Sequence, residues 1–298
     1  MKISDFLKKG FSYVLRHTPG SSMIPDKTYL SWLYRLHIGH KMDWESPTSF
    51  NQKIQWLKVN DRNPQHTIMV DKLRVKSLVA NRIGLEYVIP TIGVWNSFDE
   101  IDFSTLPNRF VLKTTHGGGG LNVMVIKDKT KLDWNKAKEK FDKSMRADVW
   151  HVYREWPYKD VPHKIIAEEY IEDEHGELRD YKFFCMNGEP QFLFLATNRM
   201  GEGDTTFDFL DLDYNRIPAL NGHPNMNTKP VAPPNFKQMV DIAKKLSKGE
   251  TFVRVDLYNV RGKIYFGEYT FFHNSGLVPF VPNEWDLKFG EKINIPKR

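Results

Sequence analysis

The chain has 298 residues, enough for one large domain or two modest ones, and its 40% hydrophobic and 27% charged residues exclude an intrinsically disordered chain. Its single cysteine, Cys185, excludes an intramolecular disulfide and a cysteine-based metal cluster, so we expect a reducing, cytoplasmic environment. The net charge of +6 suits an acidic partner such as a nucleotide, an acidic polysaccharide or a lipid head group, but the basic residues are spread along the chain, so nucleic acid is not expected.

The first 62 residues are predicted to form a helical segment. It begins with apolar residues at helical spacing and basic residues among them: Ile3, Phe6, Leu7, Phe11, Val14 and Leu15, with Lys8, Lys9 and Arg16. This pattern is typical of a helix that rests on the anionic inner surface of a membrane, or of a helix packed on the rest of the protein, which is the commoner case. No apolar stretch is long enough to span a bilayer.

The next elements are two helices and a strand. SPTSFNQKIQWLKV, which starts at Ser46, offers Ser46 or Thr48 as a helix cap. A second helix is predicted in MVDKLRVKSLVANRIG and ends at Gly84. A strand follows in YVIPTIGVW.

From residue 109 the pattern becomes strand-rich. We predict strands at 109–115, 121–127, 163–171, 180–186 and 190–197, with one helix in WNKAKEKFDKSMRADVWHVYREW between the second and the third. Residues 217–234 contain five prolines and are predicted to be an irregular loop. A helix at about 235–248 and two strands, TFVRVDLYNV and KIYFGEYTFF, complete the pattern.

Four consecutive glycines lie between the first two of these strands, in FVLKTTHGGGG. A P-loop or a Rossmann turn would need a helix directly after the glycines, so neither is predicted. A glycine loop between strands can instead fold its bare amides over phosphates, and Lys113 would add a positive charge there. A mobile surface hairpin without a ligand remains an equal alternative.

The last two strands carry a candidate metal site. Arg254 and Asp256 alternate with apolar residues and therefore share one face of their strand. If Arg261-Gly262-Lys263 forms a three-residue loop, Asp256 lies opposite Glu268 and Arg254 lies opposite Thr270. Facing carboxylates repel unless a cation or a proton lies between them, and this separation suits Mg²⁺. There are two alternatives. One of the two carboxylates is simply solvated, or the loop is one residue shorter and the two acids are staggered rather than directly opposite.

Two further stretches suit nucleotide binding. KIIAEEYIEDEHGE is a predicted strand that runs into an acidic turn, and its backbone could meet adenine, although such acidic strand ends are usually only solvated. Lys182 lies among apolar neighbours in LRDYKFF, where a lysine is costly without an anionic partner, so it is a candidate phosphate ligand.

These stretches occur in an order that resembles the ATP-grasp superfamily and, within it, the TupA-like branch that is associated with teichuronopeptide and other bacterial surface-polysaccharide biosynthesis. The motifs, in chain order, are SFNQKIQWLKVNDRNP, VDKLRVKSLVANRIG, RFVLKTTHGGGG, IIAEEYI, DYKFFCMNGEPQF, RVDLY and YFGEYTFFHNSG. The resemblance implies an α+β fold in which two subdomains grip ATP. We expect a helical segment at 1–62 and an ATP-grasp domain at 63–298, with 109–171 as the lid and nucleotide-binding subdomain and 172–298 as the metal and substrate subdomain.

The resemblance also implies a role for each matching residue. The residues that would contact the phosphates or form the lid are Lys72, Lys113, His116, Gly117, Gly118, Gly119 and Gly120. Those that would form the adenine hinge are Glu168, Glu169, Tyr170 and Ile171. Lys182 would reach the terminal phosphate, and Arg254 would stabilise the charge of the transferred group. Asp256 and Glu268 would bind one or two Mg²⁺ ions. Thr270 stands where many members have a metal-binding asparagine, so the second ion would be weaker or held through water.

The family implies an ATP-dependent carboxylate–amine ligase that works through an acyl phosphate. Its partners would be ATP, an acidic sugar or polysaccharide precursor such as a uronic acid, and an amine, expected to be an amino acid. Trp32, Trp56 and Trp95 are candidates to stack on the sugar, although burial in the core is the commoner outcome for such residues. The alternatives are a glycosyltransferase, with Asp211-Leu212-Asp213 as the nearest acidic pair, and a non-catalytic ATP-binding scaffold.

Overall fold

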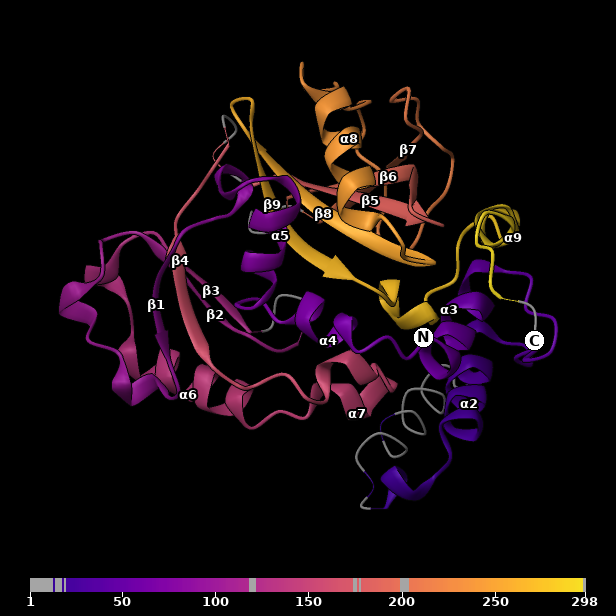
Figure 1. Cartoon of the computed structure of the whole chain (residues 1–298), viewed down its shortest axis with the longest axis horizontal. Coiled ribbons are helices and arrows are strands. Elements are labelled where there is room, and N and C mark those ends of the chain that lie inside the picture. Colours follow the sequence, from indigo (N-terminus) through magenta and orange to yellow (C-terminus); the bar gives the residue numbers. More distant parts are fainter. Residues whose placement is uncertain are drawn as a thin grey trace.

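The computed structural model describes residues 13, 18, 20–117, 122–173, 176, 178–198 and 204–296 of the chain. It has an α+β fold with two antiparallel sheets, and helices lie between the sheets and to one side of them (Figure 1). The predicted fold class is confirmed. No helix in the described residues is both long and apolar enough to cross a membrane. The predicted amphipathic helix at the start of the chain lies almost entirely outside the described residues.

The first sheet has four strands in the order β1-β4-β2-β3. They are β1 Thr91–Trp95, β2 Phe110–Thr114, β3 Val123–Ile126 and β4 Ile165–Glu169. Alternate residues of β2 are buried and pack with α6, Trp134–Met145, in a core of their own. The predicted lid subdomain, 109–171, contains three of these strands, whereas β1 precedes its predicted start.

The second sheet has five strands in the order β7-β6-β5-β8-β9 and forms the centre of the main core. They are β5 Asp180–Met186, β6 Glu189–Thr197, β7 Thr206–Leu210, β8 Phe252–Val260 and β9 Lys263–Thr270. Every residue of β5 is buried because both faces are covered. Phe183 packs on α8, Phe236–Ser247, while Phe184 packs on Phe50 at the start of α3.

The remaining helices frame the sheets. They are α2 Asp26–Ile38, α3 Phe50–Asn60, α4 Gln65–Val70, α5 Val75–Ile83, α7 Val149–Tyr153 and α9 Glu284–Glu291. The 3₁₀ helices are η1 Ser21–Met23, η2 Leu85–Tyr87, η3 Phe98–Glu100, η4 Phe103–Thr105, η5 Lys129–Lys131, η6 Trp156–Tyr158 and η7 His273–Gly276. The cap of α3 is Ser49, the residue after Thr48, and it forms a capping box with Gln52.

Two predicted helices are each broken in the structure. The helix expected over MVDKLRVKSLVANRIG is interrupted at Asp71, whose Oδ1 accepts hydrogen bonds from the backbone N–H of Leu73 and Arg74 and so starts α5 afresh. This interruption puts Lys72 in a turn rather than on a helix face. The helix expected over 134–156 divides into α6 and α7. Strand β7 was not predicted, whereas 217–234 contains no helix or strand, as expected.

The predicted loop between the last two strands was wrong by one residue, yet the predicted pairs are correct. Arg261 and Gly262 alone form the turn, both with positive φ, as a two-residue hairpin requires. A bulge at Gly267 then adds one residue to β9 and shifts the register back. Asp256 therefore lies opposite Glu268, and Arg254 lies opposite Thr270.

The contact between α9 and the start of α3 leaves no room for a side chain at Gly290. A Cβ at this residue would lie 2.2 Å from the carbonyl oxygen of Thr48 and 2.6 Å from the amide nitrogen of Phe50. Beside it, Lys53 donates to the carbonyl of Gly290 at 2.8 Å.

We expect Gly290→Ala to destabilise the protein. Alanine normally stabilises a helix interior by up to about 1 kcal/mol relative to glycine. The clash with rigid backbone should outweigh this and lower the free energy of unfolding by about 1–3 kcal/mol. Urea denaturation would measure the change, and the exposed substitution Lys288→Ala on the same helix should stay within about 0.5 kcal/mol of wild type. A more stable Gly290→Ala protein would contradict the packing described here.

Candidate functional site

A pocket lies between the two sheets and receives side chains from both. Its lining residues are Lys72, Val75, Lys76, Val88, Ile89, Lys113, Glu168, Phe266 and Gly267. Lys113 and Glu168 come from β2 and β4 of the first sheet, and Gly267 is the bulge residue of β9. The turn between α4 and α5 is joined to the end of β2, because the N–H of Lys72 donates to the carbonyl of Thr115 at 3.0 Å.

Three lysines and one glutamate make this pocket basic. Glu168 Oε2 lies 2.5 Å from the Lys113 ammonium, and Glu168 Oε1 lies 2.6 Å from that of Lys76. Burial acts to raise the pKa of Glu168, but the two lysines outweigh it and hold the pKa below its ordinary value. The third ammonium, that of Lys72, donates to the carbonyl of Gly117 at the root of the glycine loop. The pocket therefore has two positive charges in excess and suits a polyanion.

An acidic cluster lies next to it on the face of the second sheet. Asp256 has no exposed surface, and its two carboxylate oxygens accept hydrogen bonds from Arg254 Nε and Nη2, both at 2.7 Å. Lys182 donates to the same carboxylate and lies 2.6 Å from Asp180. Burial acts to raise the pKa of Asp256, but Arg254 and Lys182 outweigh it and lower the pKa to about 2. The carboxylate is therefore ionised at neutral pH.

Glu268 joins the two regions. It follows the bulge residue Gly267, which lines the basic pocket, and it lies opposite Asp256. Its carboxylate is 30% exposed and lies 3.6 Å from the guanidinium of Arg254. Burial lowers the pKa of Lys72, and the nearby charge of Glu268 opposes that change. With Arg254 and Lys182 against three carboxylates, this cluster has one negative charge in excess.

The acidic pair fits a metal that also takes ligands from a phosphate. Among the described residues, no group of three or more His, Cys, Asp or Glu side chains could hold a metal ion. Asp256 and Glu268 offer hard carboxylate oxygens on facing strands, the type of ligand that Mg²⁺ combines with substrate phosphates. The ammonium of Lys182 now lies against Asp256, so a cation at that carboxylate would have to replace it.

The other predicted nucleotide contacts lie in different settings. The His116 ring is buried, stacks on His163 at 3.5 Å and bonds the carbonyl of Ser144, so it can anchor the glycine loop but does not line the pocket. Gly117 is described, whereas Gly118, Gly119 and Gly120 lie outside the described residues.

The predicted adenine hinge follows the end of β4. Glu168 points to the lysines, so any contact with adenine would come from the backbone or from the residues after it. Glu169 is exposed at the end of the strand. The ring of Tyr170 lies under the Arg109 guanidinium, and its hydroxyl donates to Glu172 at 2.7 Å. Ile171 is partly buried directly after it.

Several residues of the site were not predicted. Lys76 follows Lys72 by four residues, and Asp180 precedes Lys182 by two on the same strand face, so both spacings were available as signals. His273 had no such signal: its Nδ1 accepts from Arg254 at 2.9 Å, and its Nε2 donates to Asn221 at 3.0 Å. Burial and the neighbouring Arg254 keep the pKa of His273 well below its ordinary value, so its ring is neutral.

Of the three tryptophans predicted to stack on a sugar, Trp56 is buried in the main core and Trp95 packs against the core of the first sheet. Trp32 is 44% exposed. The prediction was wrong for Trp56, since its ring is used in packing.

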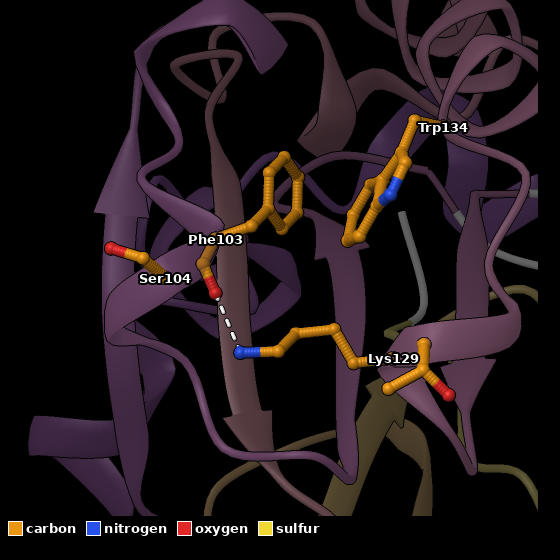
Figure 2. Close-up of a pocket in the computed structure, with 5 residues that line it drawn as sticks. Phe103, Ser104, Lys129 and Trp134 are labelled. Carbon is orange, nitrogen blue, oxygen red and sulfur yellow. Dashed lines mark hydrogen bonds between the residues drawn. The ribbon is translucent and has the colours of Figure 1, made fainter.

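A second pocket, lined by residues of η4, η5 and the start of α6, does not have the features of an active site. Figure 2 shows Phe103 and Trp134 on one side and Lys129 on the other. The Lys129 ammonium donates to the carbonyls of Phe103 and Leu106 at 2.7 and 2.5 Å. The hydroxyls of its other two lining residues, Ser104 and Thr130, donate to aspartates in local turns. Its polar groups are therefore already used by the protein.

Two antiparallel sheets with a basic pocket between them, beside two facing acids, are the arrangement that the resemblance to ATP-grasp proteins implied. The sequence matches the family model described as TupA-like ATPgrasp over residues 52–294, so the chain belongs to the TupA-like ATP-grasp family, within the ATP-grasp superfamily. The predicted family is confirmed, and the predicted enzyme class, an ATP-grasp ligase, agrees with it. No curated protein matches the sequence.

Several solved structures are similar in fold. D-alanine–D-alanine ligase from Helicobacter pylori has a TM-score of 0.45 and 14% identity over 84% of this chain and 70% of its own. The same ligase from Bacillus anthracis with ATP has a TM-score of 0.40 and 15% identity, over 82% and 62%. A RimK domain ATP-grasp protein from Sphaerobacter thermophilus has a TM-score of 0.43 and 9% identity, over 78% and 70%. The chain thus spans 62–70% of the length of these proteins, and the family assignment rests on the sequence match.

The lowered pKa of Asp256 predicts a specific dependence of stability on pH. A folded-state pKa below the ordinary 3.8 stabilises the fold at every pH above 3.8, and this contribution is lost as the pH falls through about 2. Asp256→Asn should therefore lower the free energy of unfolding at pH 7 by about 2–4 kcal/mol, and its deficit should shrink towards pH 2.

Urea denaturation of both proteins at pH 7 and near pH 2 would measure that deficit. The exposed Asp213→Asn variant is the matched control and should behave like wild type at both pH values. A deficit that is independent of pH would mean that Asp256 acts through packing rather than through its charge.

Proposed function

We propose that the protein is an ADP-forming carboxylate–amine ligase that binds ATP in the pocket between its sheets. The observation that supports this most directly is the contact of two oppositely charged regions at Gly267 and Glu268. The basic pocket suits the phosphates, and the adjacent acids suit the divalent ion that accompanies them. In this proposal Lys72, Lys76 and Lys113 bind the α- and β-phosphates, and Gly117–Gly120 close over them.

Glu168 keeps these lysines in place. Its carboxylate fixes the ammonium groups of Lys76 and Lys113 before the nucleotide binds. Binding therefore costs little further side-chain conformational entropy. A fixed array of donors needs little reorganisation during reaction, and this preorganisation is the main source of electrostatic catalysis.

Phosphoryl transfer would take place above β8 and β9. Asp256 and Glu268 would hold a bound Mg²⁺, which would supply positive charge against the charge that develops on the phosphates. Lys182 would reach the terminal phosphate, while Arg254, which is held by Asp256 and His273, would face the transferred group. Thr270, opposite Arg254, could hold a second ion only through its hydroxyl or a water.

The chemistry explains why no nucleophilic side chain is needed. A carboxylate cannot expel oxide, so the γ-phosphoryl group is first transferred to the acid, and an amine then displaces phosphate from the acyl phosphate. We further propose that the acid is a uronic acid of a bacterial surface polysaccharide and that the amine is an amino acid. Family membership supports this substrate class. The enzyme would act in the cytoplasm, in contact with the inner membrane surface if the basic N-terminal segment binds lipid.

The acidic pair named for the glycosyltransferase alternative is used within a turn. Asp211 Oδ1 accepts from the backbone N–H of Asp213 at 3.0 Å and of Asn215 at 2.7 Å, so it stabilises the turn after β7. The discriminating experiment incubates the protein with Mg²⁺ and uronic acids, and measures whether ATP or a nucleotide sugar is consumed. ATP binding without turnover over a broad panel of acids and amines would instead support a non-catalytic scaffold.

Glu268→Gln should separate turnover from nucleotide binding. The side chain is partly exposed, so the variant should fold, and loss of a metal ligand should reduce ADP formation by about 100-fold or more. The dissociation constant for the nucleotide, measured by calorimetry, should change by less than about tenfold, because the lysines of the basic pocket remain. Glu284→Gln, exposed on α9, is the control. Near wild-type turnover in Glu268→Gln would refute the metal site.

A further inference from the structure

A fully buried lysine lies beside the proposed reaction site. Lys58, on α3, has no exposed surface, although lysine is among the residue types least often buried. Its ammonium donates to the hydroxyl and to the backbone carbonyl of Ser275, each at 2.8 Å. Burial lowers the pKa of Lys58 to about 8, and the charge of Glu155 opposes that change. In the described part of the chain no carboxylate lies within 4 Å of this ammonium.

Ser275 connects the lysine to a glutamate. Its hydroxyl accepts from Lys58 and donates to Glu155 Oε1 at 2.6 Å, which fixes one oxygen of that carboxylate. The other oxygen, Oε2, has no hydrogen-bond partner among the described residues, and the Glu155 side chain is only partly buried. Glu155 thus has one oxygen held by the protein and one available to a ligand.

The glutamate also lies close to the groups proposed for phosphoryl transfer. Ser275 belongs to η7 together with His273, which bonds Arg254 at 2.9 Å. The charge of Arg254 lowers the pKa of Glu155, although burial raises it more. Burial raises the pKa of Tyr158, and the nearby charges of Glu155 and Glu268 raise it further. In Figure 1, α7, which ends just before Glu155, lies below α4 and close to the segment that follows β9.

We propose that Glu155 binds the ammonium group of the amine substrate and accepts its proton, with Ser275 and Lys58 as the residues that position it. The inference rests on the ligase function proposed above. An amine substrate is a cation at neutral pH and cannot attack until it loses a proton. Of the acids around Arg254, Glu268 and Asp256 are assigned to the metal, and Asp180 is buried against Lys182. Glu155, in contrast, is partly exposed and has an oxygen without a hydrogen-bond partner among the described residues.

The proposed step moves two protons and exchanges one bond at the carbonyl carbon. Glu155 takes one proton from the ammonium, and the freed lone pair of the nitrogen forms a bond to the carbonyl carbon of the acyl phosphate. The bond between that carbon and the phosphate oxygen breaks. The second amine proton leaves with the phosphate, and the product is an amide. A carboxylate whose pKa is raised by burial is better matched to this proton transfer at neutral pH than an exposed one.

The test compares two nucleophiles in Glu155→Gln. Wild type and variant are incubated with Mg²⁺, ATP and a panel of uronic acids, with either amino acids or hydroxylamine, which is uncharged at neutral pH and traps an acyl phosphate as a hydroxamate. Glutamine keeps an acceptor for the Ser275 hydroxyl, so the variant should fold. We expect amide formation to fall by about 10- to 100-fold, mainly through a higher KM for the amine, with hydroxamate formation within about twofold of wild type.

Other outcomes lead to different conclusions. Unchanged amide formation in Glu155→Gln, or an equal loss of both products, would overturn the assignment of Glu155 and leave the ligase proposal intact. Wild type that forms neither product with any acid would overturn the ligase proposal and this inference with it. Ser275→Ala should raise the KM for the amine and leave hydroxamate formation unchanged, and Glu139→Gln, exposed on α6, should change neither.

Discussion

The Asp256 carboxylate is the group on which the rest of the site depends. A carboxylate with no exposed surface is stable only if other groups replace its solvation, and here Arg254 and Lys182 do so. Those side chains come from β8 and β5, two neighbouring central strands, so sheet register decides whether the charges meet. The Arg254 guanidinium extends the network to His273 and from there to Asn221 in the loop before α8. One buried charge therefore fixes the positions of two strands, a short helix and a loop.

The two-sheet arrangement keeps opposite charges apart until a ligand needs both. The first sheet and α5 provide ammonium groups, and the second sheet provides most of the carboxylates. Glu168 is the exception: it lies among the lysines and compensates part of their charge. Without a nucleotide, the basic pocket keeps two positive charges in excess and the acidic cluster keeps one negative charge in excess. A magnesium nucleotide has negative phosphates that match the lysines and a positive ion that matches the carboxylates. This match is the physical reason for assigning it to this pocket.

The sequence predicted the fold class from the ordered family motifs and the facing acids from alternation along two strands. The second prediction holds only because the bulge at Gly267, which was not predicted, offsets the one-residue error in the predicted turn. The sequence misjudged the helices around Asp71 and Ala147, where local capping and turn contacts outweigh helical periodicity. The network of Lys58, Ser275 and Glu155 could not be predicted in the same way. Its contacts join residues more than a hundred positions apart, and neither Lys58 nor Glu155 stands in a distinctive motif. Side chains whose roles depend on tertiary contacts cannot be recognised from the local pattern of the sequence.

The hairpin that carries Asp256 and Glu268 has a consequence for related chains and for redesign. Its two-residue turn and its bulge each shift the alignment of β9 by one position, and only their sum brings the acids face to face. Without the bulge, the two-residue turn would place Gly267 opposite Asp256 and send the Glu268 side chain to the other face of the sheet. Deleting Gly267 would make Phe266 and Glu268 consecutive partners of Leu257 and Asp256, so the two acids would stay opposite each other in a regular ladder. Among homologues, then, a one-residue deletion between Lys263 and Glu268 should be found together with loss of the bulge, whereas a two-residue deletion there should not be tolerated.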